Sequence, residues 1–172
     1  MADGATPLKV NSTSVIPGLN NVYTLGTSTA KWNTVYATTF SGTATTAQYA
    51  DLAEIYESDA DYEVGTVVIF GGEKEITISK EGNSTAVAGV ISENPAYLMN
   101  SSSTGLPVAL QGKVKCKVIG PIRKGDMLST DQNHNGVAKK THEPRVGTVI
   151  GKALEDYDSS EIGAINIVAG RC

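Results

Sequence analysis

From residue 64 onward, the sequence alternates between short runs of apolar residues and turns that contain glycine. Gly71-Gly72 and Asn135-Gly136 favour tight hairpins, because their backbones reach positive φ at little steric cost. Many short strands at near-regular spacing predict an antiparallel β-sandwich or a small β-barrel. The predicted strands are 65–70, 75–79, 86–92, 107–111, 114–119, 136–139, 146–154 and 164–168.

One of these runs indicates which of its faces is buried. Residues 113–118 alternate between lysine and an apolar residue. Because successive side chains of a strand point to opposite faces, the alternation predicts an apolar face against a core and a cationic face in solvent. Exposed lysines also discourage unwanted pairing at a sheet edge, so solubility is a sufficient explanation for the cationic face.

Residues 41–57 separate this β-rich part from the preceding part of the chain. Thr45 and Gln48 have the spacing of a capping box, which predicts that a short helix begins there. A helix this short is stable only when it is packed, so it should contact either the C-terminal domain or the same helix in neighbouring subunits. Its apolar stripe, at positions i, i+3, i+4 and i+7, would be Tyr49, Leu52, Ala53 and Tyr56.

The first 43 residues contain few charges, several turn signals and no helical period. Trp32, Tyr36 and Phe40 fall on one face of a predicted strand, because side chains alternate along a strand. The aliphatic side chains of this part are too few for a core of its own, so we expect it to pack against copies of itself or another protein. The predicted organisation is an extended arm or short shaft at 1–43, a short helix and acidic linker at 44–63, and a β domain at 64–172.

The sharpest local match to a ligand-binding motif is a calcium-type loop. Asp131, Asn133 and Asn135, followed by Gly136, occupy positions 1, 3, 5 and 6 of that loop. His142 stands at position 12, where a bidentate glutamate is required. The sequence therefore predicts a plain turn, and calcium binding at Asp131, Asn133 and Asn135 is the alternative.

Composition and motifs exclude several classes of function. The net charge is −4 and the lysines and arginines are scattered, so the electrostatic footprint of a nucleic-acid-binding protein is missing. The acidic residues at 51–61 and 155–161 are interpreted as solvated surface. No motif for a nucleophile, a metal or a cofactor occurs, so no catalytic residue, metal or cofactor is predicted. No apolar run has the length of a secretory signal or a membrane span, so we expect synthesis in the cytoplasm and no membrane partner.

Residues 25–40 read LGTSTAKWNTVYATTF, and residues 49–54 read YADLAE. These segments resemble parts of tail-fibre and related structural proteins of tailed bacteriophages. The resemblance implies a β element wound into a trimeric shaft, followed by a C-terminal globular domain. The Gly125-Asp126 turn and the later segments GVAK and VGTVIGKALE also resemble small capsid-decoration proteins, which trimerise through β-barrel domains. YADLAE is distantly similar to the AEYFEW segment of self-cleaving chaperone domains in phage appendage proteins, although no matching catalytic pair is identified.

Together these features predict a non-enzymatic structural protein of a phage virion, made in the host cytoplasm. The expected form is a homotrimeric, fibre-like component that binds other virion proteins of the tail or capsid, and in a fibre tip also the host surface. One alternative is a capsid-decoration or head-fibre protein, and another is a self-cleaving assembly chaperone with a cut near residues 49–61. Burial of a large side chain stabilises by about 1.5–3 kcal/mol, so the expected subunit contacts are Trp32, Tyr36, Phe40, Tyr49, Leu52, Ala53 and Tyr56.

Overall fold

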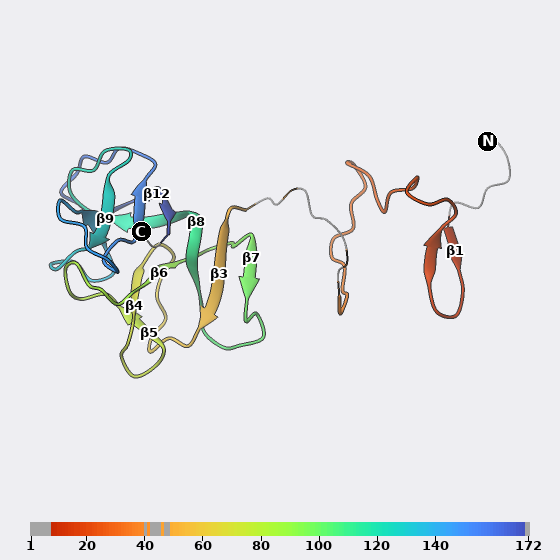
Figure 1. Cartoon of the computed structure of the whole chain (residues 1–172), viewed down its shortest axis with the longest axis horizontal. Helices are drawn as coiled ribbons and strands as arrows, with labels where there is room; N and C mark the ends of the chain where they lie inside the picture. Colours follow the sequence, from red (N-terminus) through yellow and green to blue (C-terminus); the bar gives the residue numbers. More distant parts are fainter. Residues whose placement is uncertain (1–7, 40, 42–45, 47–48, 171–172) are drawn as a thin grey trace. The chain divides into compact units, whose positions relative to one another are not determined.

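The computed structural model describes residues 8–39, 41, 46 and 49–170. The chain divides into two compact units, residues 1–43 and residues 44–172. All regular structure within the described residues is β-strand, and none of it is helix (Figure 1). The prediction of a mainly β fold is therefore confirmed, and the predicted short helix is wrong.

The N-terminal unit contains one small antiparallel hairpin, formed by β1 (Leu8–Val10) and β2 (Val15–Pro17). Asn11 stabilises its turn, because the side-chain oxygen accepts hydrogen bonds from the backbone N–H groups of Thr13 and Ser14, at 2.9 and 2.8 Å. Both strands are exposed along their whole length. An isolated two-stranded hairpin is at best marginally stable in water, so this unit depends on further contacts.

The prediction of a strand that carries Trp32, Tyr36 and Phe40 is wrong for the described residues. Residues 32–39 contain no strand, and Phe40 lies outside the described residues. A strand needs a neighbour that satisfies its backbone N–H and C=O groups. Alternating large rings therefore do not produce a strand here without a pairing partner.

Five strands of the C-terminal unit form a closed barrel. Four of the pairings between neighbouring strands are antiparallel. The fifth pairing is parallel and closes the barrel, where Ala138 pairs with Val118. In their order around the barrel, the strands are β8 (Leu106–Val118), β12 (Gly163–Ala169), β11 (Gly151–Ala153), β9 (Met127–Thr130) and β10 (Ala138–Lys140).

Strand β8 extends beyond the barrel and carries the rest of the sheet. Its second half pairs with β12, and its first half pairs with β3 (Asp51–Tyr56) and with β6 (Val87–Ile91). The remaining strands continue outward from these two: β7 (Tyr97–Met99) pairs with β3, β4 (Val67–Phe70) pairs with β6, and β5 (Ile76–Ile78) pairs with β4.

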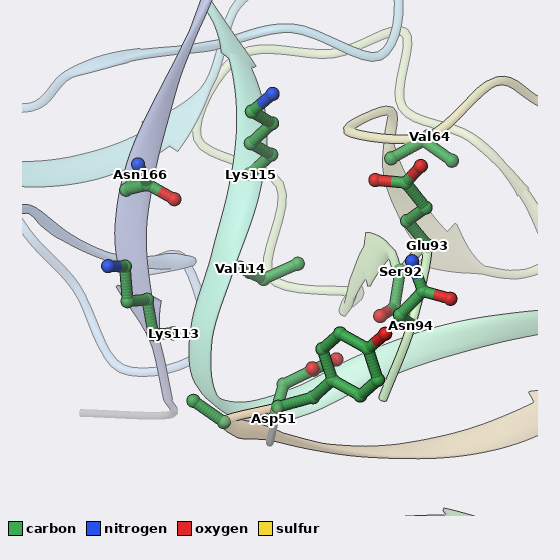
Figure 2. Close-up of a pocket in the computed structure, with 11 residues that line it drawn as sticks. Asp51, Val64, Ser92, Glu93, Asn94, Lys113, Val114, Lys115 and Asn166 are labelled. Atoms are coloured by element: carbon green, nitrogen blue, oxygen red, sulfur yellow. The ribbon is translucent and has the colours of Figure 1, made fainter. Parts of the chain in front are cut away.

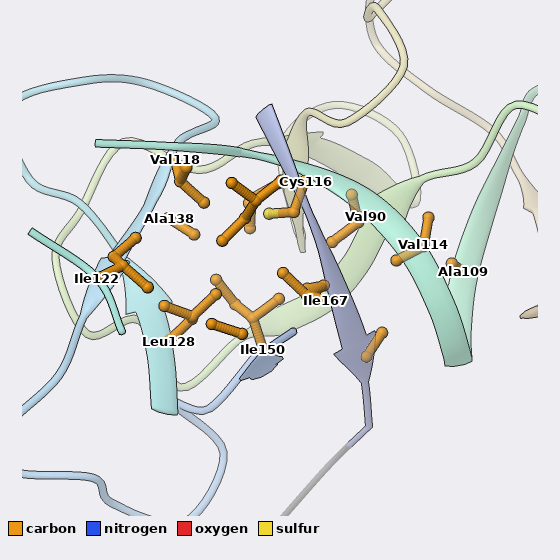
Figure 3. Close-up of a cluster of buried hydrophobic side chains, with 14 residues drawn as sticks. Val90, Ala109, Val114, Cys116, Val118, Ile122, Leu128, Ala138, Ile150 and Ile167 are labelled. Carbon is orange, nitrogen blue, oxygen red and sulfur yellow. The ribbon is translucent and has the colours of Figure 1, made fainter. Parts of the chain in front are cut away.

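Two clusters of buried side chains hold this unit together. The larger cluster fills the barrel and includes Cys116, Ile122, Leu128 and Ile167 (Figure 3). Burial raises the pKa of the Cys116 thiol to about 12, so this cysteine stays protonated and acts as an apolar core residue. The smaller cluster contains Val68, Ile76, Ala88, Ile91 and Val108.

Residues 51–56 form β3 rather than the predicted helix. Asp51 and Ala53 are buried and Leu52 is exposed, which is the alternation of a strand. Pairing with β8 gives the backbone of β3 the partners that a helix would have supplied internally, and such tertiary contacts override helix propensity. Thr45 and Gln48, the predicted capping box, lie outside the described residues.

Gly112 allows β3 to approach β8 closely at the start of β3. Gly112 pairs with Asp51 and has a φ of +106°, a conformation that disfavours any residue with a Cβ atom. A Cβ atom at this position would also overlap with the carbonyl oxygen of Ala50. The position of the Ala50–Asp51 peptide bond therefore depends on a glycine at residue 112.

Gly112→Ala should destabilise the C-terminal unit more than Gly125→Ala does. Gly125 also has a positive φ, +92°, but a Cβ atom there would meet nothing within 4 Å. Gly125→Ala therefore reports backbone strain alone, about 1–3 kcal/mol, whereas Gly112→Ala adds the overlap with Ala50. Urea unfolding of both variants measures the difference, and equal losses of stability would show that the close approach is not needed.

Candidate functional site

Asp51, at the start of β3, is a buried carboxylate. Its exposed fraction is 5%, and its Oδ2 atom has no hydrogen-bond partner among the residues that the structure describes. Burying an unpaired polar group costs free energy, and a buried charge costs more. Native proteins keep few such groups, and a role in chemistry is one of the recognised reasons for keeping them. Asp51 is therefore the strongest candidate for a functional residue.

Asp51 lines a cavity of about 350 Å³ (Figure 2). The segment 92–96 connects β6 to β7, and its residues Ser92, Glu93 and Asn94 line the same cavity. This segment is fixed beside β3, because the backbone N–H of Ala96 donates a hydrogen bond to the carbonyl oxygen of Asp51, at 2.8 Å. The other lining residues are Tyr49, Ala50, Val64, Lys113, Val114, Lys115 and Asn166.

The cavity contacts the backbone that leads into β3. Tyr49 and Ala50 line it together with Asp51, so both sides of the Ala50–Asp51 peptide bond border the cavity. A space of this size has room for water molecules beside the buried carboxylate. The site thus places a carboxylate, a peptide bond and space for water next to one another.

Glu54 is a second carboxylate on β3, and it is fully hydrogen-bonded. Its two oxygens accept hydrogen bonds from the hydroxyl of Tyr56 and from the side-chain N–H of Asn100, each at 2.7 Å. Residues 51 and 54 point to opposite faces of the strand, because successive side chains alternate. Glu54 therefore does not supply the missing partner of Asp51.

The acidic residues of segment 51–61 do not form one solvated surface, as the sequence had suggested. Glu57, Asp59 and Asp61 are exposed, but Asp51 is buried. Sequence reasoning missed Asp51 because it assigned this residue to the outer face of a helix. The signal that could have revealed it is strand-like alternation, in which Asp51 shares a face with Ala53.

The predicted subunit contacts are not brought together within one chain. Trp32 and Tyr36 are 63% and 95% exposed, and Tyr49 and Leu52 are partly exposed. Ala53 is fully buried in the C-terminal unit. Tyr56 packs against the smaller buried cluster and lies edge-on to Phe70, with ring centroids 5.4 Å apart. Ala53 and Tyr56 thus contribute to packing inside the domain, and the subunit interface stays a prediction.

Asp131, the first residue of the calcium candidate, is already paired with several donors. Its Oδ2 accepts hydrogen bonds from the backbone N–H groups of Asn133 and His134, at 2.9 and 3.0 Å, and lies 2.8 Å from Nδ1 of His134. Its Oδ1 lies 3.0 Å from Nζ of Lys139. These contacts fix the turn between β9 and β10 without a metal ion, and calcium binding stays a prediction.

Neither a metal-binding cluster nor a membrane-spanning helix is present among the described residues. No group of three or more His, Cys, Asp or Glu side chains within the described ranges could hold a metal ion. In the same part of the chain, no helix is long and apolar enough to cross a membrane.

The fold and the site define a β-barrel domain whose first strand begins at a buried carboxylate with an oxygen that has no partner among the described residues. Residues 5–106 match the model of a protein family, Peptidase_G2, described as the IMC autoproteolytic cleavage domain. Because the match spans more than half of the chain, the chain belongs to this family. The match includes the N-terminal unit, β3 and the segment 92–96. No curated protein matches the sequence.

Asp131→Asn should destabilise the protein in a way that depends on pH. Burial raises the pKa of Asp131, but hydrogen bonds from His134 and Lys139 lower it more, to about 2 from the ordinary 3.8. The resulting stabilisation, on the order of 2 kcal/mol, is complete above pH 3.8 and is lost as the pH falls towards 2. Urea unfolding at pH 7, 4 and 2.5 should therefore show a gap between wild type and variant that closes at low pH. Asp61→Asn, at an exposed carboxylate, is the control. A difference in the free energy of unfolding that does not change with pH, or that Asp61→Asn shows as well, would contradict this account.

Proposed function

We propose that this chain is a self-cleaving domain that cuts the peptide bond between Ala50 and Asp51. The cut separates residues 1–50 from the β domain, residues 51–172. The observation that carries the proposal is the buried Oδ2 of Asp51, which has no partner among the described residues and lies next to that bond. Membership of an autoproteolytic family supports self-cleavage rather than turnover of a separate substrate.

The chemistry of the proposed step is a hydrolysis that consumes one water molecule. The carboxylate of Asp51 accepts a proton from water in the cavity, and the resulting hydroxide adds to the carbonyl carbon of Ala50. The bond between that carbon and the nitrogen of Asp51 then breaks, and the proton passes to the nitrogen. The products are a carboxylate on Ala50 and an amino group on Asp51. Proximity favours the step, because the base and the bond belong to neighbouring residues.

A cut at this bond would leave the β domain intact. Asp51 is the first residue of β3, and all six residues of β3 pair with β8. The three residues of β7 pair with β3 beyond the cut as well. Cleavage therefore removes only backbone that precedes the sheet, and it needs no unfolding of the domain.

We propose in addition that the uncleaved chain assembles into homotrimers as a component of a phage virion. Support comes from the resemblance of residues 25–40 to fibre proteins and from the N-terminal unit, in which no described residue is buried. An apolar surface of this kind is expected to be covered by a partner. Its exposed large side chains include Leu8, Val10, Val15, Ile16, Leu25, Trp32, Val35 and Tyr36.

Asp51→Asn should abolish cleavage, because asparagine keeps the shape of the side chain but cannot accept the proton. Intact-mass spectrometry of the purified wild-type chain should show two fragments, 1–50 and 51–172, whereas the variant should remain full length. Asp61→Asn, at an exposed carboxylate of the same segment, is the matched control and should cleave like wild type. Fragments of the same mass from Asp51→Asn would overturn the role of Asp51, and fragments of other masses would overturn the position of the cut.

Charged substitutions in the N-terminal unit should weaken the oligomer before cleavage. In the background of Asp51→Asn, Trp32→Asp and Tyr36→Asp should shift native mass spectra from trimer to monomer, because a buried charge opposes association. Val146→Asp, at a 92% exposed apolar residue of the β domain, is the control and should leave the trimer intact. A trimer that survives both N-terminal substitutions would show that these rings do not hold the subunits together.

A further inference from the structure

Ser92 is a second buried polar residue at the cavity. It is 4% exposed, and its side-chain hydroxyl makes no hydrogen bond to any residue in the described ranges. The backbone holds it in place, since its N–H donates a hydrogen bond to the carbonyl oxygen of Pro107, at 2.9 Å. Its hydroxyl oxygen is not among the fully buried polar atoms that lack a partner, so the hydroxyl is accessible and free to donate its proton to an acceptor. Among the described residues, an accessible hydroxyl without a partner and a buried carboxylate oxygen without a partner therefore border the same cavity.

The two lysines that line the cavity are less suited than Ser92 to pair with Asp51. Lys113 and Lys115 are exposed. Hydrogen bonds from Asn166, and then the charges of these two lysines, lower the pKa of Glu155. Figure 2 shows the amino group of Lys113 directed towards Asn166, while the Asp51 carboxylate extends towards the segment that carries Ser92 and Asn94.

We propose that Ser92 is a positioning residue for self-cleavage, and this inference rests on the proposed function. Its hydroxyl donates a hydrogen bond to Oδ2 of Asp51, which fixes the carboxylate and leaves Oδ1 to accept the proton from water. This hydrogen bond is not formed in the structure, so it requires a rotation about the Cα–Cβ bond of Ser92 to another staggered rotamer. Ser92 does not touch the reacting atoms, and it acts only through Asp51.

A pair of variants of the same shape separates the hydroxyl from the packing at residue 92. Ser92→Thr keeps the hydroxyl and adds a methyl group, whereas Ser92→Val has nearly the same shape without a hydroxyl. Ser92→Val should slow cleavage of the full chain by about 10- to 100-fold relative to Ser92→Thr, as expected for one hydrogen bond to a charged group. The rates come from intact-mass spectrometry at successive times after the chain is refolded from denaturant.

The outcomes distinguish this inference from the proposed function. If Asp51→Asn still cleaves, the proposed function fails. If Asp51→Asn is inactive but Ser92→Thr and Ser92→Val cleave at equal rates, whether fast or slow, only the role of Ser92 is overturned. Thermal unfolding monitors whether both variants fold, and if Ser92→Val does not fold, the comparison of Ser92→Ala with wild type replaces it, with the same decrease in rate expected.

Discussion

The structure depends on the backbone pairing of a single strand, β8. Its second half closes the barrel with β12, and its first half pairs with β3 on one side and with β6 on the other. Gly112 lies at the change from one half to the other, and its positive φ and missing Cβ atom let the chain bend while β3 remains in contact. Because both parts of the ten-stranded sheet share this strand, displacing β8 would disturb the barrel core and the cavity at Asp51 together.

This shared strand explains how the domain tolerates an unpaired carboxylate. Burial of Asp51 opposes folding, but its backbone is held by pairing with Gly112 on β8 and by the hydrogen bond from Ala96. The surrounding sheet therefore determines the position of Asp51, and the side chain does not need to find its own partner. An unfavourable local arrangement of this kind persists where many surrounding contacts hold it in place. Such arrangements are common at catalytic sites.

The sequence predicted much of the fold because the relevant signals are local. The alternation in 113–118 gave the correct inward and outward faces, and the turns at Gly71-Gly72 and Asn135-Gly136 do join antiparallel strands. Strand β9 was missed because it buries Ser129 and Thr130, whose hydroxyls resemble those of a loop. Strand β3 was mistaken for a helix because Leu52, Ala53 and Tyr56 fit the apolar stripe of a helix. The same residues also fit a strand, and the pairing of this segment with β8 is what selects the strand. Asp51 and Ser92 are distant in sequence, so their common cavity follows from the crossover between β6 and β7, which no local pattern encodes.

The contrast between the two units gives a physical reason for the proposed cut near the start of the C-terminal unit. The β domain has two buried clusters and paired strands up to Asp51, so it is stable without residues 1–50. The described part of the N-terminal unit buries no side chain, and its hairpin cannot be stable alone. In the proposed assembly, the folded domain of the intact chain would keep the N-terminal units of associated copies at a high effective concentration. The link would no longer be required once those units had packed together, and the proposed cut before Asp51 would leave the pairing of β3 with β8 in place.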